Sequence, residues 1–495
     1  MTEHMIDLGL NFDNSYAEQL EGFYVQVKGD EAPAPKLLYL NRSLAESLGF
    51  DLDKLPADQL AAVLSGGITV KGGSSIAQTY AGHQFGHFNP QLGDGRALLL
   101  GEVIDRSGNR QDIQLKGSGA TPFSRGGDGK AALAPVLREY VIGEAMHVLN
   151  IPTTRALAAV ATGEDVMRDE PLPGAVLARV ASSHIRIGTF QFFANRKEGD
   201  KVKQLADYAI ARHYPEVQTA DNPYLEFLRA VAKRQALLIA KWMSIGFVHG
   251  VMNTDNVTIS GETIDYGPCA FIDKYDPTAV FSSIDHQGRY AFASQADIGQ
   301  WNMARLAEAL LPLIDVDSEE AVRLASKTLD DFAEHYRESW LALMRAKLGL
   351  STSEENDPVI ISELFDLMEA QSIDFTLLFR GLADVLQENK SGLLNLFLEP
   401  APFERWLATW SERLTRETLP AEERIALMNG VNPLYIPRNH IVEEALQAAE
   451  KEANYAPIEK LMDVLSDPYT EREGFEEYAL PPSTDLAPYK TFCGT

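Results

Sequence analysis

The stretch that decides the fold is His249-Gly250-Val251-Met252-Asn253-Thr254-Asp255-Asn256, and Ile264-Asp265-Tyr266-Gly267 follows it closely. Asn256 and Asp265 offer an amide oxygen and a carboxylate. Carboxylate and carbonyl oxygens are the ligands that Mg²⁺ and similar hard cations take up in proteins. By their places in this motif, Asn256 and Asp265 are the predicted metal ligands.

The order of these residues matches the catalytic loop of protein kinases and their metal-binding Asp-aromatic-Gly turn, with one difference. In the kinase pattern the third loop residue is the catalytic Asp and the last is a metal-binding Asn. Asn256 and Asp265 occupy the two metal-binding positions of the kinase pattern. Val251 occupies the position of the catalytic Asp, and its side chain cannot accept a proton. The sequence predicts either a kinase without phosphotransfer or a protein that uses ATP for different chemistry.

Length and composition are those of a globular protein. The chain has 495 residues, 45% of them hydrophobic and 23% charged, which is enough for two or more lobes. A formal net charge of −27 argues against nucleic acid and anionic membranes as partners, because both attract basic surfaces. There is no signal-peptide pattern, no run near ~20 apolar residues and only two cysteines, so we expect a cytoplasmic protein.

Hydrophobic periodicity predicts strands first and helices afterwards. Strands are expected at 97–104, 112–116 and 174–180, with a polar turn between the first two. Helices are expected from near Pro135 to 149, over 223–245, and after Ser294 as an N-cap, with helical patterns to about 465.

This order predicts an α+β protein-kinase-like fold with two lobes, a mixed strand-helix N-lobe and a predominantly helical C-lobe with extensions. The expected divisions are an N-terminal extension packed on the N-lobe (1–90), the N-lobe with the nucleotide-phosphate site (91–190), the C-lobe with the catalytic loop and metal site (191–465) and a C-terminal tail (466–495).

Lys116 and Glu139 are candidates for the ion pair that holds ATP phosphates in such a lobe. Lys116 ends the second predicted strand, where a kinase places its phosphate lysine, and Glu139 follows 23 residues later on the next predicted helix. Gly93 and Gly95 belong to a Gly-Asp-Gly-Arg turn at the place of a kinase glycine loop, and 126–130 is a second glycine-rich loop. The turn alone is also typical of a simple hairpin.

Arg179 and Arg186 predict unusual chemistry. They flank the end of the third strand, near the place where a kinase binds adenine. A guanidinium is an unfavourable neighbour for adenine, but it can bind phosphate oxygens through two parallel hydrogen bonds. We infer that the nucleotide lies reversed, with its terminal phosphates toward the arginines and the α-phosphate toward the metal. The alternative is two surface arginines in unrelated ion pairs.

Four long motifs resemble the selenoprotein O family: Tyr80 through Gly86, Pro90 through Arg96, Gln114 through Gly119, and His249 through Asn256. The resemblance covers nearly the whole chain. It implies a kinase-like fold that binds ATP reversed and transfers AMP to Ser, Thr or Tyr hydroxyls of target proteins, with Mg²⁺ or Mn²⁺ as cofactor and with release of pyrophosphate. A monomer is expected.

The resemblance also implies roles for single residues. Asn256 and Asp265 hold the metal, and Asp255 is the proton acceptor, although it could instead only orient the attacking hydroxyl or support the metal from outside. The nucleotide-binding residues are Gly93, Gly95, Arg96, Lys116, Asp128, Gly129, Arg179, Arg186 and Asp265.

Two other functions stay open, a kinase with an atypical base and a nucleotide-binding pseudokinase that serves as a scaffold. The absent catalytic Asp favours the scaffold over the kinase. An enzyme is favoured over the scaffold because four residues of the kinase pattern are retained, namely Lys116, Glu139, Asn256 and Asp265.

The two cysteines suggest a redox switch. Cys269 follows the predicted metal Asp at the place of a kinase activation segment, and Cys493 is near the end of the chain, where some members of the resembled family carry selenocysteine. We expect a regulatory disulfide that ties the tail across the active-site lobe. The alternative is two unrelated thiols.

Overall fold

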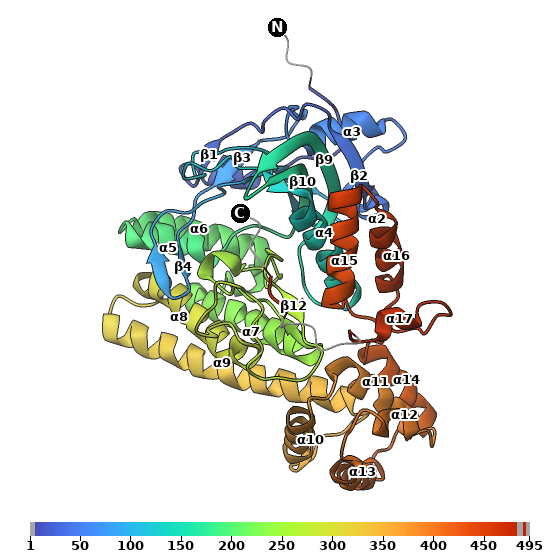
Figure 1. Ribbon diagram of the computed structural model, residues 1–495. Helices are drawn as coiled ribbons and strands as arrows, with labels where there is room; N and C mark the ends of the chain where they lie inside the picture. Colours follow the sequence, from blue (N-terminus) through green and yellow to red (C-terminus); the bar gives the residue numbers. More distant parts are fainter. Residues whose placement is uncertain (1–4, 483–488, 492–495) are drawn as a thin grey trace.

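A large antiparallel sheet forms the upper half of the molecule (Figure 1). The computed structural model describes residues 5–482 and 489–491. The strand order is β1-β3-β6-β7-β10-β9-β2, and β8 pairs with β10. The bounds are β1 Tyr24–Gln26, β2 Lys36–Leu40, β3 Ile76–Gln78, β6 Ala97–Ile104, β7 Arg110–Lys116, β8 Ala131–Ala132, β9 Arg155–Met167 and β10 Pro171–Ala181.

Both faces of this sheet are covered. Helix α4 (Leu133–Val148) packs on one face, where Leu99 joins Leu137 in the larger core. Helices α2 (Arg42–Leu48) and α3 (Ala57–Leu64) cover the other face, where Leu98 and Leu100 lie in a second core. Because successive side chains of a strand point to opposite faces, the continuous apolar run of β6 supplies both cores.

A helical half lies below the sheet and carries the loop with Asp255 (Figure 1). Helices α7, α8 and α9 pack against one another, and a short hairpin of β11 and β12 leads into and out of that loop. The bounds are α5 Ile187–Asn195, α6 Gly199–His213, α7 Pro223–Ser244, β11 Phe247–Val248, η2 Thr254–Asn256, β12 Ala270–Phe271, α8 Gln295–Ile314 and α9 Ser318–Lys347.

The C-terminal helices form two groups (Figure 1). The first group, α10 to α14, continues from the C-terminal end of α9. In the second group, α15 and α16 pack against α4 beside the sheet. The bounds are α10 Asp357–Gln371, α11 Phe375–Val385, α12 Ser391–Leu394, α13 Pro400–Leu414, α14 Ala421–Val431, α15 Asn439–Glu452, α16 Ala456–Leu465 and α17 Glu476–Ala479. The remaining short elements are α1 Ser15–Gln19, β4 Gly82–Gln84 and β5 His87–Asn89.

The architecture is mixed α/β with antiparallel sheets, and most local predictions are confirmed. The predicted strand 97–104 is β6, and the helices predicted from Pro135 and over 223–245 are α4 and α7. Ser294 directly precedes α8, but its side chain makes no capping hydrogen bond, because its own backbone is already helical. Among the described residues, no helix combines the length and the apolar character needed to span a bilayer.

Two segments lie in places that the linear order did not predict. Residues 24–78 contribute β1, β2 and β3 to the main sheet, so the predicted extension 1–90 is built into the same layer as the strands that follow it. Helices α15 and α16 fall within the predicted C-lobe range 191–465 but pack on α4 beside the sheet.

Lys347, the last residue of α9, is a buried lysine outside any predicted site. Its Nζ lies 4.4 Å from the ring centroid of Phe379, and burial lowers the pKa of its ammonium group to about 7. An unfolded chain keeps this lysine protonated to pH ~10.4. Between these values the unfolded state binds more protons, so the stability of the fold rises with pH.

We expect Lys347→Met to raise the unfolding midpoint near pH 7 and to flatten the rise in stability between pH 7 and 10. The gain is of the order of a few kcal/mol, since the side chain no longer gives up a proton or buries a charge. Thermal unfolding at several pH values measures it, with Lys327→Met on the exposed side of the same helix as the control. A lower midpoint for Lys347→Met at pH 7 would contradict the expectation.

Candidate active site

A cavity of about 860 Å³ lies between the sheet and the helical half. All the residues predicted to bind nucleotide or metal, and the predicted proton acceptor, line it, although they come from seven separate stretches of sequence. They are Gly93, Gly95, Arg96, Lys116, Asp128, Gly129, Arg179, Arg186, Asp255, Asn256 and Asp265.

Asp265 is the centre of the charges in this cavity. Its Oδ1 accepts from Lys116 Nζ at 2.8 Å and from Arg179 Nη1 at 2.7 Å, and its Oδ2 accepts from Arg186 Nη1 at 2.9 Å. Burial would raise the pKa of this carboxyl, but the three cations hold it well below its usual range. Asp265 is thus a permanent carboxylate that gathers the side chains of Lys116, Arg179 and Arg186 on one side of the cavity.

Glu139 supports the same cations from α4. Its two carboxylate oxygens accept from Lys116 Nζ at 2.6 Å and from Arg179 Nη1 at 2.7 Å. Burial works against ionisation of Glu139, but Lys116 and Arg179 outweigh it and lower its pKa. The predicted Lys116–Glu139 ion pair is present, and Glu139 lies behind the cavity wall.

Arg179 and Arg186 lie beside Lys116, so the predicted phosphate pocket and metal site are contiguous. Gln114 Oε1 accepts from Arg179 Nε at 2.9 Å and from its Nη2 at 2.7 Å, which fixes the guanidinium plane. The guanidinium carbon of Arg186 lies 4.6 Å from the ring centroid of Tyr80. Its Nη1 donates to the backbone oxygen of Asp255 at 2.7 Å. Tyr80 and Gln114 had no predicted role, although both lie in quoted motifs.

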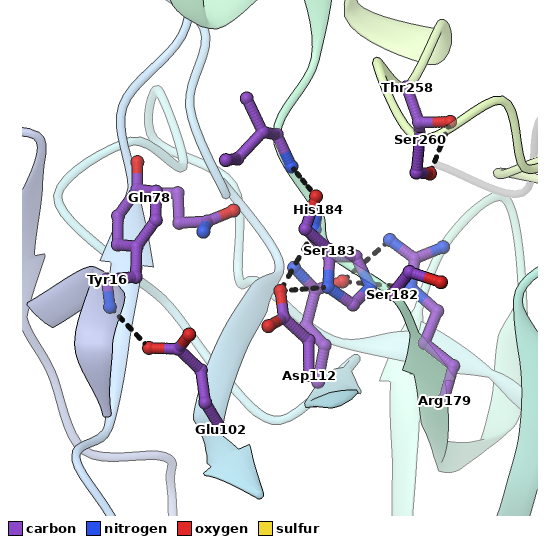
Figure 2. Close-up of polar contacts among 12 residues, drawn as sticks. Tyr16, Gln78, Glu102, Asp112, Arg179, Ser182, Ser183, His184, Thr258 and Ser260 are labelled. Atoms are coloured by element: carbon purple, nitrogen blue, oxygen red, sulfur yellow. Dashed lines mark hydrogen bonds and ion pairs between the residues drawn. The ribbon is translucent and has the colours of Figure 1, made fainter. Parts of the chain in front are cut away.

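The turn between Arg179 and Arg186 is anchored by a buried polar cluster (Figure 2). Asp112 Oδ2 accepts from the backbone N–H of His184 at 2.9 Å and lies 3.0 Å from its Nδ1. Asp112 Oδ1 accepts from Arg212 Nη2 at 2.7 Å. Burial keeps His184 neutral by lowering its pKa to about 4. These bonds tie β7 and α6 to the turn, so both arginines are held on a rigid frame.

Asn256 and Asp265 fit a divalent cation. Asn256 Nδ2 donates to the backbone oxygen of Val251 at 3.0 Å, and this orientation leaves Oδ1 to act as a ligand. Across the described part of the chain, no group of three or more His, Cys, Asp or Glu side chains is arranged to hold a metal ion. One amide and one carboxylate suit Mg²⁺, which commonly completes its shell with water and substrate phosphates.

Asp255 is buried beside the cation cluster, and its environment favours a proton acceptor. Burial raises the pKa of its carboxyl to about 6, against the hydrogen bond from Gln84 and the charge of Arg186. Gln84 Nε2 donates to its Oδ2 at 3.1 Å. A carboxylate with a raised pKa is a stronger base than an exposed one, and it remains ionised at neutral pH.

Two glycine-containing loops line the cavity. Gly93 and Gly129 have φ angles of 84° and 68°, and a Cβ at either position would collide with Phe123 or with the backbone at Gly119. Asp128 is exposed and accepts from Arg168 Nη1 at 2.8 Å. Arg168, at the β9–β10 turn, was not predicted and brings a further cation to the cavity.

Cys269 lies just behind the site. Its thiol is fully buried, and burial raises its pKa to about 11. Cys493 lies outside the described residues, so the predicted disulfide remains a prediction. Tyr489, four positions before Cys493, accepts from Arg138 Nη1 at 2.8 Å, and the Nη2 of the same arginine donates to the backbone oxygen of Cys269 at 2.7 Å.

A basic cavity beside an Asn–Asp oxygen pair is typical of metal-dependent enzymes that transfer part of a nucleotide. A family model described as "Protein adenylyltransferase SelO" matches residues 7–466. The chain belongs to this family.

Curated relatives agree with this assignment. A protein nucleotidyltransferase YdiU of Cereibacter sphaeroides (strain KD131) is 58% identical over 486 residues, covering 98% of this chain and 99% of the relative. Proteins of the same name from Rhizobium meliloti (strain 1021) and Rhodopseudomonas palustris (strain BisB18) are 55% and 54% identical, each over 98% of this chain and 99% of the relative.

Proposed function

We propose that this protein transfers AMP from ATP to Ser, Thr or Tyr hydroxyls of other proteins and releases pyrophosphate. The observation that carries the proposal is the pairing of two features of one cavity. Val251 lines it at the position of the kinase catalytic Asp, while Lys116, Arg179 and Arg186 converge on Asp265. The site can neutralise a polyphosphate but lacks the base for ordinary phosphotransfer.

We also infer a protein-kinase-like arrangement of two lobes. Lys116 at the end of β7, Glu139 on α4 and the loop that follows β11 have the chain order and the contacts of the corresponding kinase parts. In this division residues 91–190 supply the phosphate site, and 191–465 supply the catalytic loop and the metal ligands.

The proposed reaction is a substitution at the α-phosphorus. The target hydroxyl oxygen attacks this atom, its proton passes to Asp255, and the bond to the β-phosphate oxygen breaks, so that pyrophosphate leaves. Lys116, Arg179 and Arg186 bind the leaving phosphates and neutralise the charge that grows on them. A divalent cation held by Asn256 and Asp265 would neutralise the α-phosphate and help to orient it. Mg²⁺ and Mn²⁺ both suit these oxygen ligands.

Differently labelled ATP tests the proposal. The protein is incubated with a bacterial lysate, Mg²⁺ and ATP that carries label on either the α- or the γ-phosphate. We expect protein-bound label from the α-position only, together with free pyrophosphate. Label from the γ-position alone would establish a kinase, and ATP binding without any transfer would establish a scaffold.

We further propose that Cys269 and Cys493 form a regulatory disulfide. The hydrogen bonds that join Tyr489, Arg138 and the backbone of Cys269 support this pairing, since they bring the described end of the tail to the segment behind Asp265. The Cys269 thiol is buried, so the bond would need a local opening and a mild oxidant that accepts two electrons as two protons leave the thiols.

The expected result of mild oxidation is a cross-linked Cys269–Cys493 peptide and a lower rate of transfer that reductant restores. Non-reducing peptide mapping detects the cross-link. Cys493→Ser should remove the dependence of the rate on oxidant, and a Cys493→Ser protein that is still inhibited would contradict the proposed pairing.

A further inference from the structure

The motif Tyr80 through Gly86 contains β4 and the turn that leads to β5, and its residues bond three successive residues of the catalytic loop. The backbone N–H of Phe85 donates to Asn253 Oδ1 at 3.1 Å, and that of His83 donates to Thr254 Oγ1 at 2.7 Å. Gln84 Nε2 donates to Asp255 Oδ2 at 3.1 Å. Three successive loop residues therefore each receive one hydrogen bond from β4 or its turn.

The hairpin is itself fixed from behind. Gln191 on α5 accepts from Thr254 Oγ1 at 2.6 Å, and its Nε2 lies 2.9 Å from His83 Nδ1. On the other side Tyr290 donates its hydroxyl to Asn253 Oδ1 at 2.7 Å. Because α5 and the segment at Tyr290 hold both partners, the hairpin cannot shift relative to the loop without breaking several buried bonds.

The carboxylate of Asp255 is confined from two sides. Gln84 holds Oδ2, while Oδ1 is buried and has no hydrogen-bond partner. Gly82 lies directly against it, since a Cβ at Gly82 would come within 2.9 Å of Asp255 Cγ and 3.0 Å of its Cβ. The absence of a side chain at Gly82 makes room for this carboxylate, and the Gln84 amide fixes its rotation.

We propose that Gln84 is a positioning residue that acts through Asp255. This inference rests on the proposed function. Gln84 has no ionisable group, so it holds the carboxylate with one N–H without adding a charge, and it leaves that carboxylate free to take the hydroxyl proton. Such transfer reactions depend mainly on positioning, and small misplacements of a reacting group are costly.

The test compares Gln84→Met and Gln84→Glu with the wild type. Met keeps the size of the side chain but cannot donate, and Glu places a second carboxylate against Asp255. The control is His87→Ala, the exposed cross-strand partner of Gln84 in the same hairpin. Rates of α-label transfer to lysate proteins are measured as ATP is varied, and ATP binding with Mg²⁺ is followed by calorimetry.

We expect the maximal rate to fall about 10- to 100-fold for Gln84→Met and further for Gln84→Glu, because a lost hydrogen bond to a charged group has this effect. The KM and dissociation constant for ATP should stay within about twofold of wild type, and His87→Ala should match wild type. A packing role would not separate maximal rate from ATP binding, nor would it rank Glu below Met.

Gly82→Ala reaches the same carboxylate from its other side and should lower the maximal rate, and the unfolding midpoint should fall as well, because the added methyl group would collide with the buried Asp255 side chain. If wild type transfers AMP and Gln84→Met transfers it equally fast, the positioning role is wrong and the proposed function stands. If wild type transfers no label from the α-position, the function and this role fall together.

Discussion

Asp265→Asn is expected to reduce AMP transfer by at least about 1000-fold. The substitution keeps the shape of the side chain, and asparagine tolerates the positive φ of 63° that this position adopts. It removes the charge that three cations and the proposed metal share, and losses of such preorganised electrostatics commonly raise a barrier by several kcal/mol. The initial rate of transfer from α-labelled ATP measures the effect.

The same substitution should also lower the stability of the fold, because Lys116, Arg179 and Arg186 lose a buried counter-charge. Thermal unfolding reports this separately from the rate. Asp276→Asn, an exposed aspartate eleven positions further on, is the matched control and should leave the rate and the midpoint unchanged. An Asp265→Asn protein that is folded and transfers AMP at more than a tenth of the wild-type rate would exclude Asp265 as a metal ligand.

Arg186→Lys is expected to lower the ratio of maximal rate to KM for ATP by about 100-fold although the positive charge is retained. Arg186 contacts three groups at once, namely Asp265, the backbone oxygen of Asp255 and the ring of Tyr80. A lysine ammonium is a compact charge without the planar fork that grips phosphate and stacks on a ring. Transfer rates and ATP binding with Mg²⁺ measure the change.

Arg196→Lys is the control for this experiment, since Arg196 follows the last residue of α5 while Arg186 precedes the first. It should leave both parameters close to wild type. Normal efficiency for Arg186→Lys would mean that charge alone serves at this position, and the phosphate grip inferred for Arg186 would be wrong.

Local sequence was sufficient where neighbouring residues carry the signal. The apolar run 97–104 became β6 because both of its faces are buried, and the periodic patterns after Pro135 and over 223–245 became α4 and α7. Strand β9 was not predicted, because its run Ala156 through Ala161 is rich in alanine, a strong helix former. Pairing with β10 and β2 on both sides overrides that preference, and the two faces of the strand are buried in the two cores.

The sequence by itself determined which residues are candidates for the chemistry: Asn256 and Asp265 as predicted metal ligands, Lys116 as the predicted phosphate lysine, and Val251 at the position of a kinase base. Only the tertiary structure decided how these groups meet. The Asp265 carboxylate accepts hydrogen bonds from Lys116, Arg179 and Arg186, which lie 149, 86 and 79 positions away in the sequence. Gln84 donates to Asp255, which lies 171 positions away. Contacts over such separations arise from strand pairing, helix packing and burial. The periodicity of a local stretch of sequence therefore cannot predict them.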